Sequence, residues 1–197
     1  MNENPYAPPA HSPGEAEQFR ERGPRPIGIS LLSMLFLGTG LMLSVFPLVL
    51  GFNSGSGSGP GVGGLKGLLG MAVLVLVAAG VIAVARGLWI GAGWGWKLGA
   101  FMFAFGIISN TSAWISVLAW PELFENSRRG AEGALAKHGT RGFFHALFLW
   151  YMFRWSVLEY FDLIEMSVLK AAAVLLGLSL LLYLASSSFF RFLILGL

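Results

Sequence analysis

Long apolar runs, separated by polar or glycine-rich segments, make up most of this chain. A helix needs about 20 apolar residues to cross roughly 30 Å of hydrocarbon, and four runs approach or exceed that length, at 27–50, 68–85, 98–120 and 168–190. Each run should be helical, because an isolated strand in lipid would leave its backbone N–H and C=O groups unpaired. The pattern therefore predicts an all-α integral membrane protein with four transmembrane helices, the last followed by a short C-terminus within 168–197.

The composition of the chain agrees with a lipid environment. Hydrophobic residues make up 55% of the 197 residues, and charged residues only 12%. Between Arg25 and Glu122 the charged side chains are Lys66, Arg86 and Lys97, and none of them is acidic. So few charges cannot cover a surface that faces water. We therefore expect the lipid bilayer to be the main partner of this chain.

The basic balance of the chain does not indicate nucleic-acid binding. Its 13 Lys and Arg residues, against 10 Asp and Glu residues, are scattered at the ends of apolar runs. There they can anchor helices at the membrane edge, and they form no basic stripe of the kind that binds nucleic acid. The chain has no cysteine, which excludes disulfides, thiolate nucleophiles and cysteine metal sites.

Two segments are too polar or too rich in glycine to cross a membrane. Residues 1–26 are rich in proline and polar side chains, which predicts a disordered tail that is retained before the first helix. The segment 53–64, NSGSGSGPGVGG, predicts a flexible connector. It contains the spacing of the dinucleotide-binding GxGxxG motif, but that motif requires a preceding strand. A membrane helix precedes it here, so we expect no nucleotide cofactor.

The connector at 121–167 changes character along its length. Its first part, PELFENSRRGAEGALAKHGTRG, is polar, and we expect it to face water. In its second part, apolar side chains recur every three or four residues, which predicts an amphipathic helix over about 142–167. These side chains are Trp150, Phe153, Val157, Tyr160, Ile164 and Val168. Such a helix would lie in the headgroup plane. The alternative, a re-entrant or spanning segment, would carry Arg154 near its middle at a cost of about 2.5 to 3.5 kcal/mol.

Four glycines spaced by four residues lie between the second and third apolar runs. In one continuous helix this spacing would form a small-residue seam for helix packing, but it would draw Arg86 or Lys97 toward the bilayer centre. We therefore predict a tight hairpin, with Trp89, Trp94 and Trp96 at headgroup depth, where such rings are enriched. The glycines expected to serve the turn or helix packing are Gly87, Gly91, Gly95 and Gly99.

Two short stretches resemble segments of a known kind of protein. GLWIGAGWGWKL at 87–98 resembles the helical hairpin of small, uncharacterised bacterial multi-pass membrane proteins with about four helices. YMFRWSVLEYF at 151–161 resembles a segment that follows an apolar helix in similar proteins. The resemblance implies a membrane fold, located in the bacterial inner membrane, and implies no known chemistry.

Positive charges near the first helix indicate its orientation. Arg20, Arg22 and Arg25 precede that helix, whereas Lys66 alone lies in the first loop. Because Lys and Arg favour the cytoplasmic side and the first helix usually dominates, we expect a cytoplasmic N-terminus. With four crossings the C-terminus would return to the cytoplasm, and the connector 121–167 would face outward.

The most polar cluster inside an apolar run is Ser109-Asn110-Thr111-Ser112, halfway along the third run. Asn110, Thr111 and Ser112 are candidates for an intramembrane polar contact with a substrate or ion. The alternative is that they hydrogen-bond between helices and stabilise helix packing.

Charged side chains in the connector are a second group of candidates. Glu159, Asp162 and Glu165 are three residues apart and should share one side of the amphipathic helix, with Arg154 as a local counter-charge. Paired carboxylates can serve acid–base catalysis or bind a cation. We expect these four residues instead to be interfacial charges on the wetted face of the helix.

Histidines in the connector could in principle form a metal site. His138 and His145 could hold a metal together with Glu132 if they shared a helix face. The intervening sequence KHGTRG is expected to break the helix between them, so we predict neither a metal nor another cofactor. No ordering of Ser, His and Asp and no HExxH motif indicates a catalytic site.

These features favour a non-enzymatic integral membrane protein that acts as a structural or interaction component. It would associate with other copies or other membrane proteins through its glycine-rich faces. A small oligomeric channel or transport accessory, with residues 109–112 lining a path, is the alternative. A membrane enzyme that uses the carboxylates at 159–165 is a third hypothesis.

Overall fold

The computed structural model describes residues 24–54, 65–124 and 130–195 of the chain. The tail predicted over 1–26 and the connector predicted over 53–64 lie almost entirely outside these residues, so the structure does not test them. Within the described ranges the protein is all-α, as the sequence predicts.

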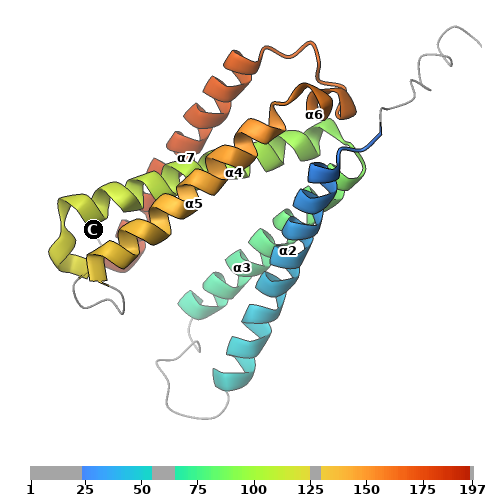
Figure 1. The fold of residues 1–197 in the computed structure, drawn as a ribbon. Helices are drawn as coiled ribbons and strands as arrows, with labels where there is room; N and C mark the ends of the chain where they lie inside the picture. The colour runs from blue at the N-terminus through green and yellow to red at the C-terminus, as the bar shows by residue number, and fades with distance from the viewer. Residues whose placement is uncertain (1–23, 55–64, 125–129, 196–197) are drawn as a thin grey trace, which may run out of the picture.

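Long helices dominate the described residues (Figure 1). In chain order the elements are α2 (Ile27–Ser54), α3 (Leu65–Trp89), α4 (Gly93–Ala119), the short 3₁₀ helix η1 (Pro121–Phe124), α5 (Gly130–Met152), α6 (Trp155–Tyr160) and α7 (Val168–Leu195). The prediction of four helices long and apolar enough to cross a membrane is confirmed, and these lie at Ile27–Val45, Gly70–Trp89, Gly93–Ala119 and Val168–Ser187.

Helices α2 and α3 form an antiparallel pair. The Ser33 hydroxyl donates to the carbonyl oxygen of Ala85 at 2.6 Å. Further along, Gly40 allows close approach, because a Cβ added there would lie 2.6 Å from Ile82 Cγ1. The first helix thus packs on the second over several turns, with one buried polar contact that uses a backbone acceptor.

Helix α4 is the central element of the remaining part. Helix α5 runs antiparallel along it. Trp96, near the start of α4, contacts Met152, the last residue of α5. Asn110, further along α4, contacts His138, which lies nearer the start of α5. Helix α7 runs parallel to α4, because Ser179 donates to Phe101 near one end and Tyr183 meets Ser112 further along.

The structure differs from the prediction of one amphipathic helix over about 142–167. Helix α5 begins at Gly130, within the part expected to face water, and ends at Met152. Arg154 is extended, with ψ of 143°, and this separates α5 from the short α6. Residues 161–167 form turns, and Asp162 has a φ of 56°.

Small residues explain why the polar part of the connector is helical. Alanine is the best helix former, and Gly139 and Gly142 face α4. Ideal Cβ atoms at these glycines would lie 3.6 Å from the Trp114 ring and 3.7 Å from Asn110 Cβ, which is ordinary contact. The packing of α5 on α4 therefore outweighs the polar composition of its first half.

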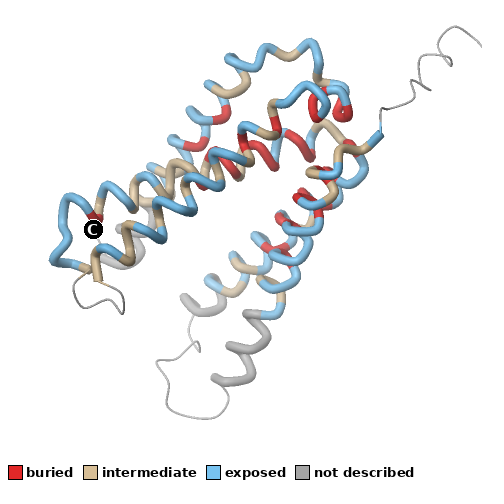
Figure 2. The backbone as a smooth tube through the Cα atoms, in the orientation of Figure 1, coloured by how far each residue is buried: buried red, intermediate tan, exposed pale blue. Residues whose placement is uncertain are grey.

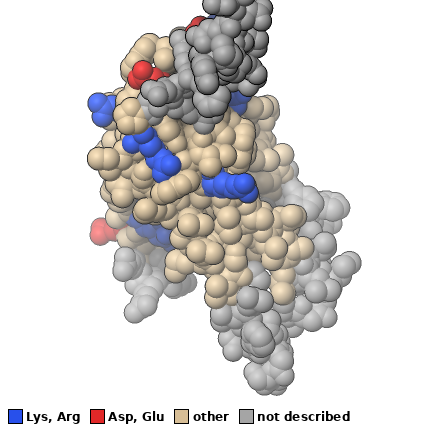
Figure 3. Space-filling view, turned by 90° about the vertical axis from the view of Figure 1, so that its right-hand side faces the viewer, with Lys and Arg blue, Asp and Glu red and all other residues tan. Residues whose placement is uncertain are grey.

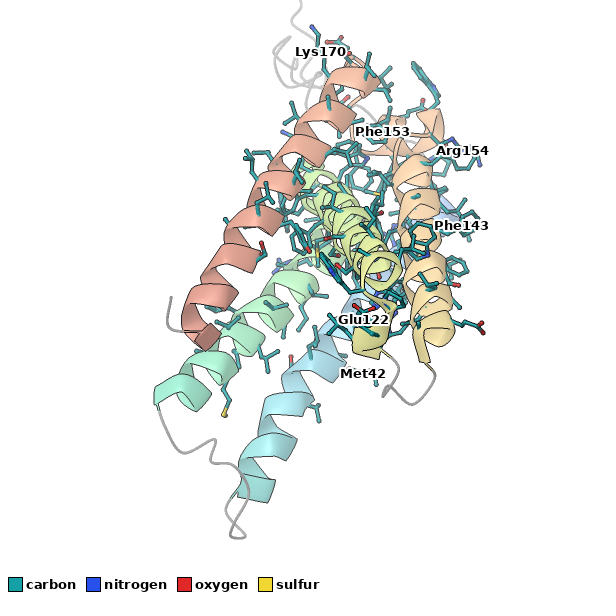
Figure 4. All side chains as sticks on the ribbon, turned by 90° about the vertical axis from the view of Figure 1, so that its left-hand side faces the viewer. Met42, Glu122, Phe143, Phe153, Arg154 and Lys170 are labelled. Carbon is teal, nitrogen blue, oxygen red and sulfur yellow. The ribbon has the colours of Figure 1, made fainter. Side chains whose placement is uncertain are left out.

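The helix directions divide the molecule into two ends. We call the end that holds residues 25–29, 86–97 and 151–170 the hairpin end. The other end, which holds η1 and the first turn of α5, is the far end. Figure 4 shows Arg154 and Lys170 at the hairpin end, away from Glu122. Because α7 runs parallel to α4, it finishes at the far end.

This direction of α7 corrects the expectation that the C-terminus shares a side with the turn between α3 and α4. It also places Arg154, which belongs to the connector expected to face outward, at the same end as Arg86, Lys97 and Lys170. The cause is α5, which follows α4 back to the hairpin end before α7 begins. A helix in the headgroup plane would have left the chain on the far side.

The buried core lies at the hairpin end, from which two arms diverge (Figures 1 and 2). One arm is α2 with α3, and the other is α4 with α5 and α7. The core includes side chains from each α-helix, among them Ile29, Leu88, Trp96, Met152 and Val157, each at most 1% exposed. Away from the core, most of the described surface is uncharged on the face shown in Figure 3. This distribution suits a chain surrounded by lipid.

Because α5 follows α4 along its length, we expect both helices to cross the bilayer. Single cysteines can test this cleanly, since the chain has none of its own. Glu122→Cys and Glu165→Cys should react with a membrane-impermeant maleimide from opposite sides of sealed vesicles. The cysteine-free chain serves as the control. Labelling of both positions from one side would contradict the prediction and would fit an in-plane connector.

Candidate functional site

The turn between α3 and α4 is built on glycines. Gly91 has a φ of 67°, a conformation that glycine adopts at little cost, and the Ala92 N–H donates to the Gly87 carbonyl at 2.9 Å. A Cβ added to Gly87 would lie 2.7 Å from Gly95 Cα. The two backbones therefore touch at this pair, whereas Gly99 makes only ordinary contact, with Leu88 Cδ2 at 3.5 Å.

The three tryptophans predicted at headgroup depth divide into two kinds. Trp89 and Trp94 are 41% and 45% exposed at the hairpin end, but Trp96 is only 1% exposed. Its indole N–H donates to the Met152 carbonyl at 2.8 Å. The last carbonyls of a helix have no partner within the helix, so Trp96 caps the end of α5. Its buried position differs from the prediction.

Three side chains join the start of α2, the end of α3 and α6. The Tyr160 hydroxyl donates to the Trp89 carbonyl at 2.8 Å and accepts from Arg25 Nε at 3.3 Å. The Arg25 guanidinium lies 3.9 Å from the centre of the Trp89 ring, in cation–π geometry. A Cβ at Gly91 would lie 2.9 Å from Tyr160 Cζ. We call these three side chains, together with Trp96 on the other side of the turn, the aromatic junction.

The aromatic junction unites the two stretches that carry the sequence resemblance, 87–98 and 151–161. No known protein family, curated protein or solved structure matches this chain. The chain itself is a helical protein with four long apolar helices, consistent with a multi-pass membrane protein.

The polar cluster of α4 is divided between two neighbouring helices. Asn110 Nδ2 donates to the Gly106 carbonyl at 2.8 Å, and its Oδ1 lies 3.3 Å from His138 Nδ1 of α5. Ser112 Oγ lies 2.6 Å from the hydroxyl of Tyr183 of α7. Thr111 is exposed. The cluster therefore does not face a single path.

A small cavity lies beside Asn110 and His138, between α4 and α5. Its volume is about 150 Å³. It is lined by Asn110, Thr111, Trp114, His138, Gly139, Gly142 and Phe143. The Asn110 and His138 side chains could together bind a small polar molecule there.

The two histidines share a helix, contrary to the expectation that KHGTRG breaks it. His138 and His145 are two turns apart on α5 and both reach α4. His145 Nδ1 donates to the Arg141 carbonyl at 2.6 Å, and its ring lies against Gly106. The spacing of seven residues is consistent with this shared helix face, but Gly139 and Gly142 led to the prediction that the helix breaks between the histidines. Within the described ranges no three His, Asp or Glu residues gather closely enough to hold a metal.

The candidate interfacial charges lie together at the hairpin end, but not on one helix. Glu159 belongs to α6, whereas Asp162 and Glu165 lie in the turns that follow it. All three are exposed, and so is Arg154, whose guanidinium lies 5.7 Å from the centre of the Trp150 ring. The predicted common helix face is therefore wrong, because the helix ends before Asp162.

We expect the stability of the fold to depend on the close contact between Gly87 and Gly95. Gly87→Ala should lower the free energy of unfolding by about 1 to 3 kcal/mol, because its methyl group overlaps the α4 backbone. The matched control is Gly80→Ala in the same helix, where nothing lies within 4 Å of an added Cβ, and helix propensity should stabilise it by up to about 1 kcal/mol. Thermal unfolding in detergent measures both. Equal midpoints for the two variants would contradict the prediction.

Proposed function

We propose that this chain is a non-enzymatic component of the membrane that acts through association with other copies of itself or with other membrane proteins. One observation carries the proposal: its intramembrane polar groups serve helix packing. Within the described part of the chain, no buried side-chain nitrogen or oxygen lacks a hydrogen-bond partner. Asn110 of α4 contacts His138 of α5, and Ser112 of α4 contacts Tyr183 of α7.

The outer face of α3 supports self-association. Ala72, Leu76, Ala79 and Ala83 are all exposed, and their spacing of four, three and four residues places them along one side of the helix. Its three small residues, Ala72, Ala79 and Ala83, allow a second helix to approach closely in lipid. The glycines at 87 and 95, by contrast, are already used within the hairpin. We therefore propose α3 as the surface of the self-association that the sequence predicts.

We further propose that the hairpin end faces the cytoplasm of a bacterial inner membrane. The bacterial location rests on the resemblance of 87–98 and 151–161 alone. The orientation is supported by the basic side chains at that end, since Lys and Arg favour the cytoplasmic side. They are Arg25, Arg86, Lys97, Arg154 and Lys170. The end of α7 would then lie outside the cytoplasm.

A small oligomeric channel or transport accessory remains the second candidate. The cavity of about 150 Å³ beside Asn110 and His138 favours it. The division of the polar cluster between α5 and α7 favours the first candidate, because Asn110 and Ser112 each already have a partner on a neighbouring helix.

The self-association should depend on the small residues of α3. Replacing Ala79 and Ala83 with Phe should lower dimer recovery by crosslinking in native membranes about tenfold, which corresponds to roughly 1.4 kcal/mol. The matched control, Ala173→Phe, changes an exposed alanine of α7 and should leave recovery unchanged. Recovery of monomers alone from the unaltered chain, with no other protein attached, would overturn the proposal.

Liposome flux distinguishes the second candidate. We expect no flux of small ions above that of empty liposomes, either for the unaltered chain or for Asn110→Leu. The substitution should instead cost about 0.6 kcal/mol of stability, the average for interhelical polar contacts in membranes, and no more than about 1.7 kcal/mol. Flux through the unaltered chain that Asn110→Leu abolishes would favour the channel.

A further inference from the structure

A groove lies between α4 and α7 at the hairpin end. Its volume is about 700 Å³, and its walls are mainly apolar side chains, among them Phe101, Val174 and Leu178. Two lysines, Lys97 and Lys170, also line it. Figure 4 shows Lys170 near the beginning of α7. The groove therefore combines an apolar floor with two cations at one end.

The helix positions place the lysines at the membrane surface and the apolar floor below them. Lys97 is the fifth residue of α4, and Lys170 is the third of α7. Leu178 follows Lys170 by eight residues, which is about 12 Å along a helix. Because both helices are long enough to cross a membrane and begin at the same end, the groove runs from the headgroup layer toward the hydrocarbon.

The charge around the lysines is not balanced within these two helices. Neither α4 nor α7 has an acidic residue in its first turn, although the start of a helix carries partial positive charge and favours anions. Lysine adds a compact positive charge of the kind that binds phosphate. Glu165, the nearest acidic residue before α7 in the sequence, is exposed in the turn region. An anion from outside the chain would complete this arrangement.

We propose that the groove binds an anionic phospholipid of the bilayer. Its phosphate would lie between Lys97 and Lys170, and one acyl chain would lie along Phe101, Val174 and Leu178. Anionic headgroups are recognised by basic pockets between membrane helices, and the apolar floor supplies the chain contact that a free anion lacks. The inference rests on the membrane-crossing helices and not on self-association through α3, so either can fail alone.

Native mass spectrometry of the full-length chain tests the lipid site. The protein is released from nanodiscs that contain equal amounts of phosphatidylglycerol and phosphatidylcholine. We expect retained phosphatidylglycerol, and an apparent affinity about thirtyfold lower when Lys97 and Lys170 are both replaced by Gln. Arg154→Gln is the matched control, because it removes an exposed cation from the same end but outside the groove.

A second variant tests the apolar part of the groove. Val174→Trp should fill the groove and lower retention while both lysines remain, and thermal unfolding of each variant shows whether it is folded. Excess inorganic phosphate should not displace the lipid, because it lacks an acyl chain. Equal retention of the two lipids, unchanged retention in the double lysine variant, or displacement by inorganic phosphate would each overturn the proposal.

Discussion

The contact between the backbones at Gly87 and Gly95 is the constraint on which the rest of the structure depends. It allows α3 and α4 to turn within three residues, so that Trp89 and Trp96 emerge on either side of the turn. Trp96 then caps the last carbonyl of α5, and the carbonyl of Trp89 receives Tyr160 of α6. The contact between Gly87 and Gly95 thus positions the two tryptophans that bind the end of α5 and the end of α6. In lipid, where apolar contact alone gives little preference among helix pairs, such close approach is a principal source of specificity.

The elements that the sequence predicts well are those in which local pattern and environment agree. The four long apolar helices follow from length and composition, and the hairpin follows from glycines flanked by Arg86 and Lys97. Helix α5 could not be predicted in the same way. Its first half is polar and contains Gly139 and Gly142, which read as breakers in isolation but serve as contact points for Trp114 and Asn110. In this segment, packing against α4 outweighs the local sequence preference, and the segment is helical.

The candidate site shows a similar division between what is local and what is not. Two residues along a helix turn through about 200°, so Asn110 and Ser112 were bound to face different neighbours. That much is contained in the sequence. The identity of those neighbours is not, because His138 reaches Asn110 only if α5 runs back along α4, and Tyr183 reaches Ser112 only if α7 runs parallel to it. The predicted helix in the connector began at about 142, whereas α5 begins at Gly130. Because of this one boundary, neither His138 nor Tyr183 could be predicted as a partner of the polar cluster.

The placement of the core has a consequence for how the molecule behaves in a bilayer. Buried side chains gather at the hairpin end, where the aromatic junction links the start of α2, the turn between α3 and α4, the end of α5, and α6. The arms diverge toward the far end (Figures 1 and 2). Segments with few buried contacts open at lower free energy than the core, so the described parts of the arms away from the hairpin end should open more readily than the hairpin end itself. A protein of this shape presents a fixed charged surface at one membrane face and adjustable apolar arms below it. That combination is consistent with the association within the membrane that we propose.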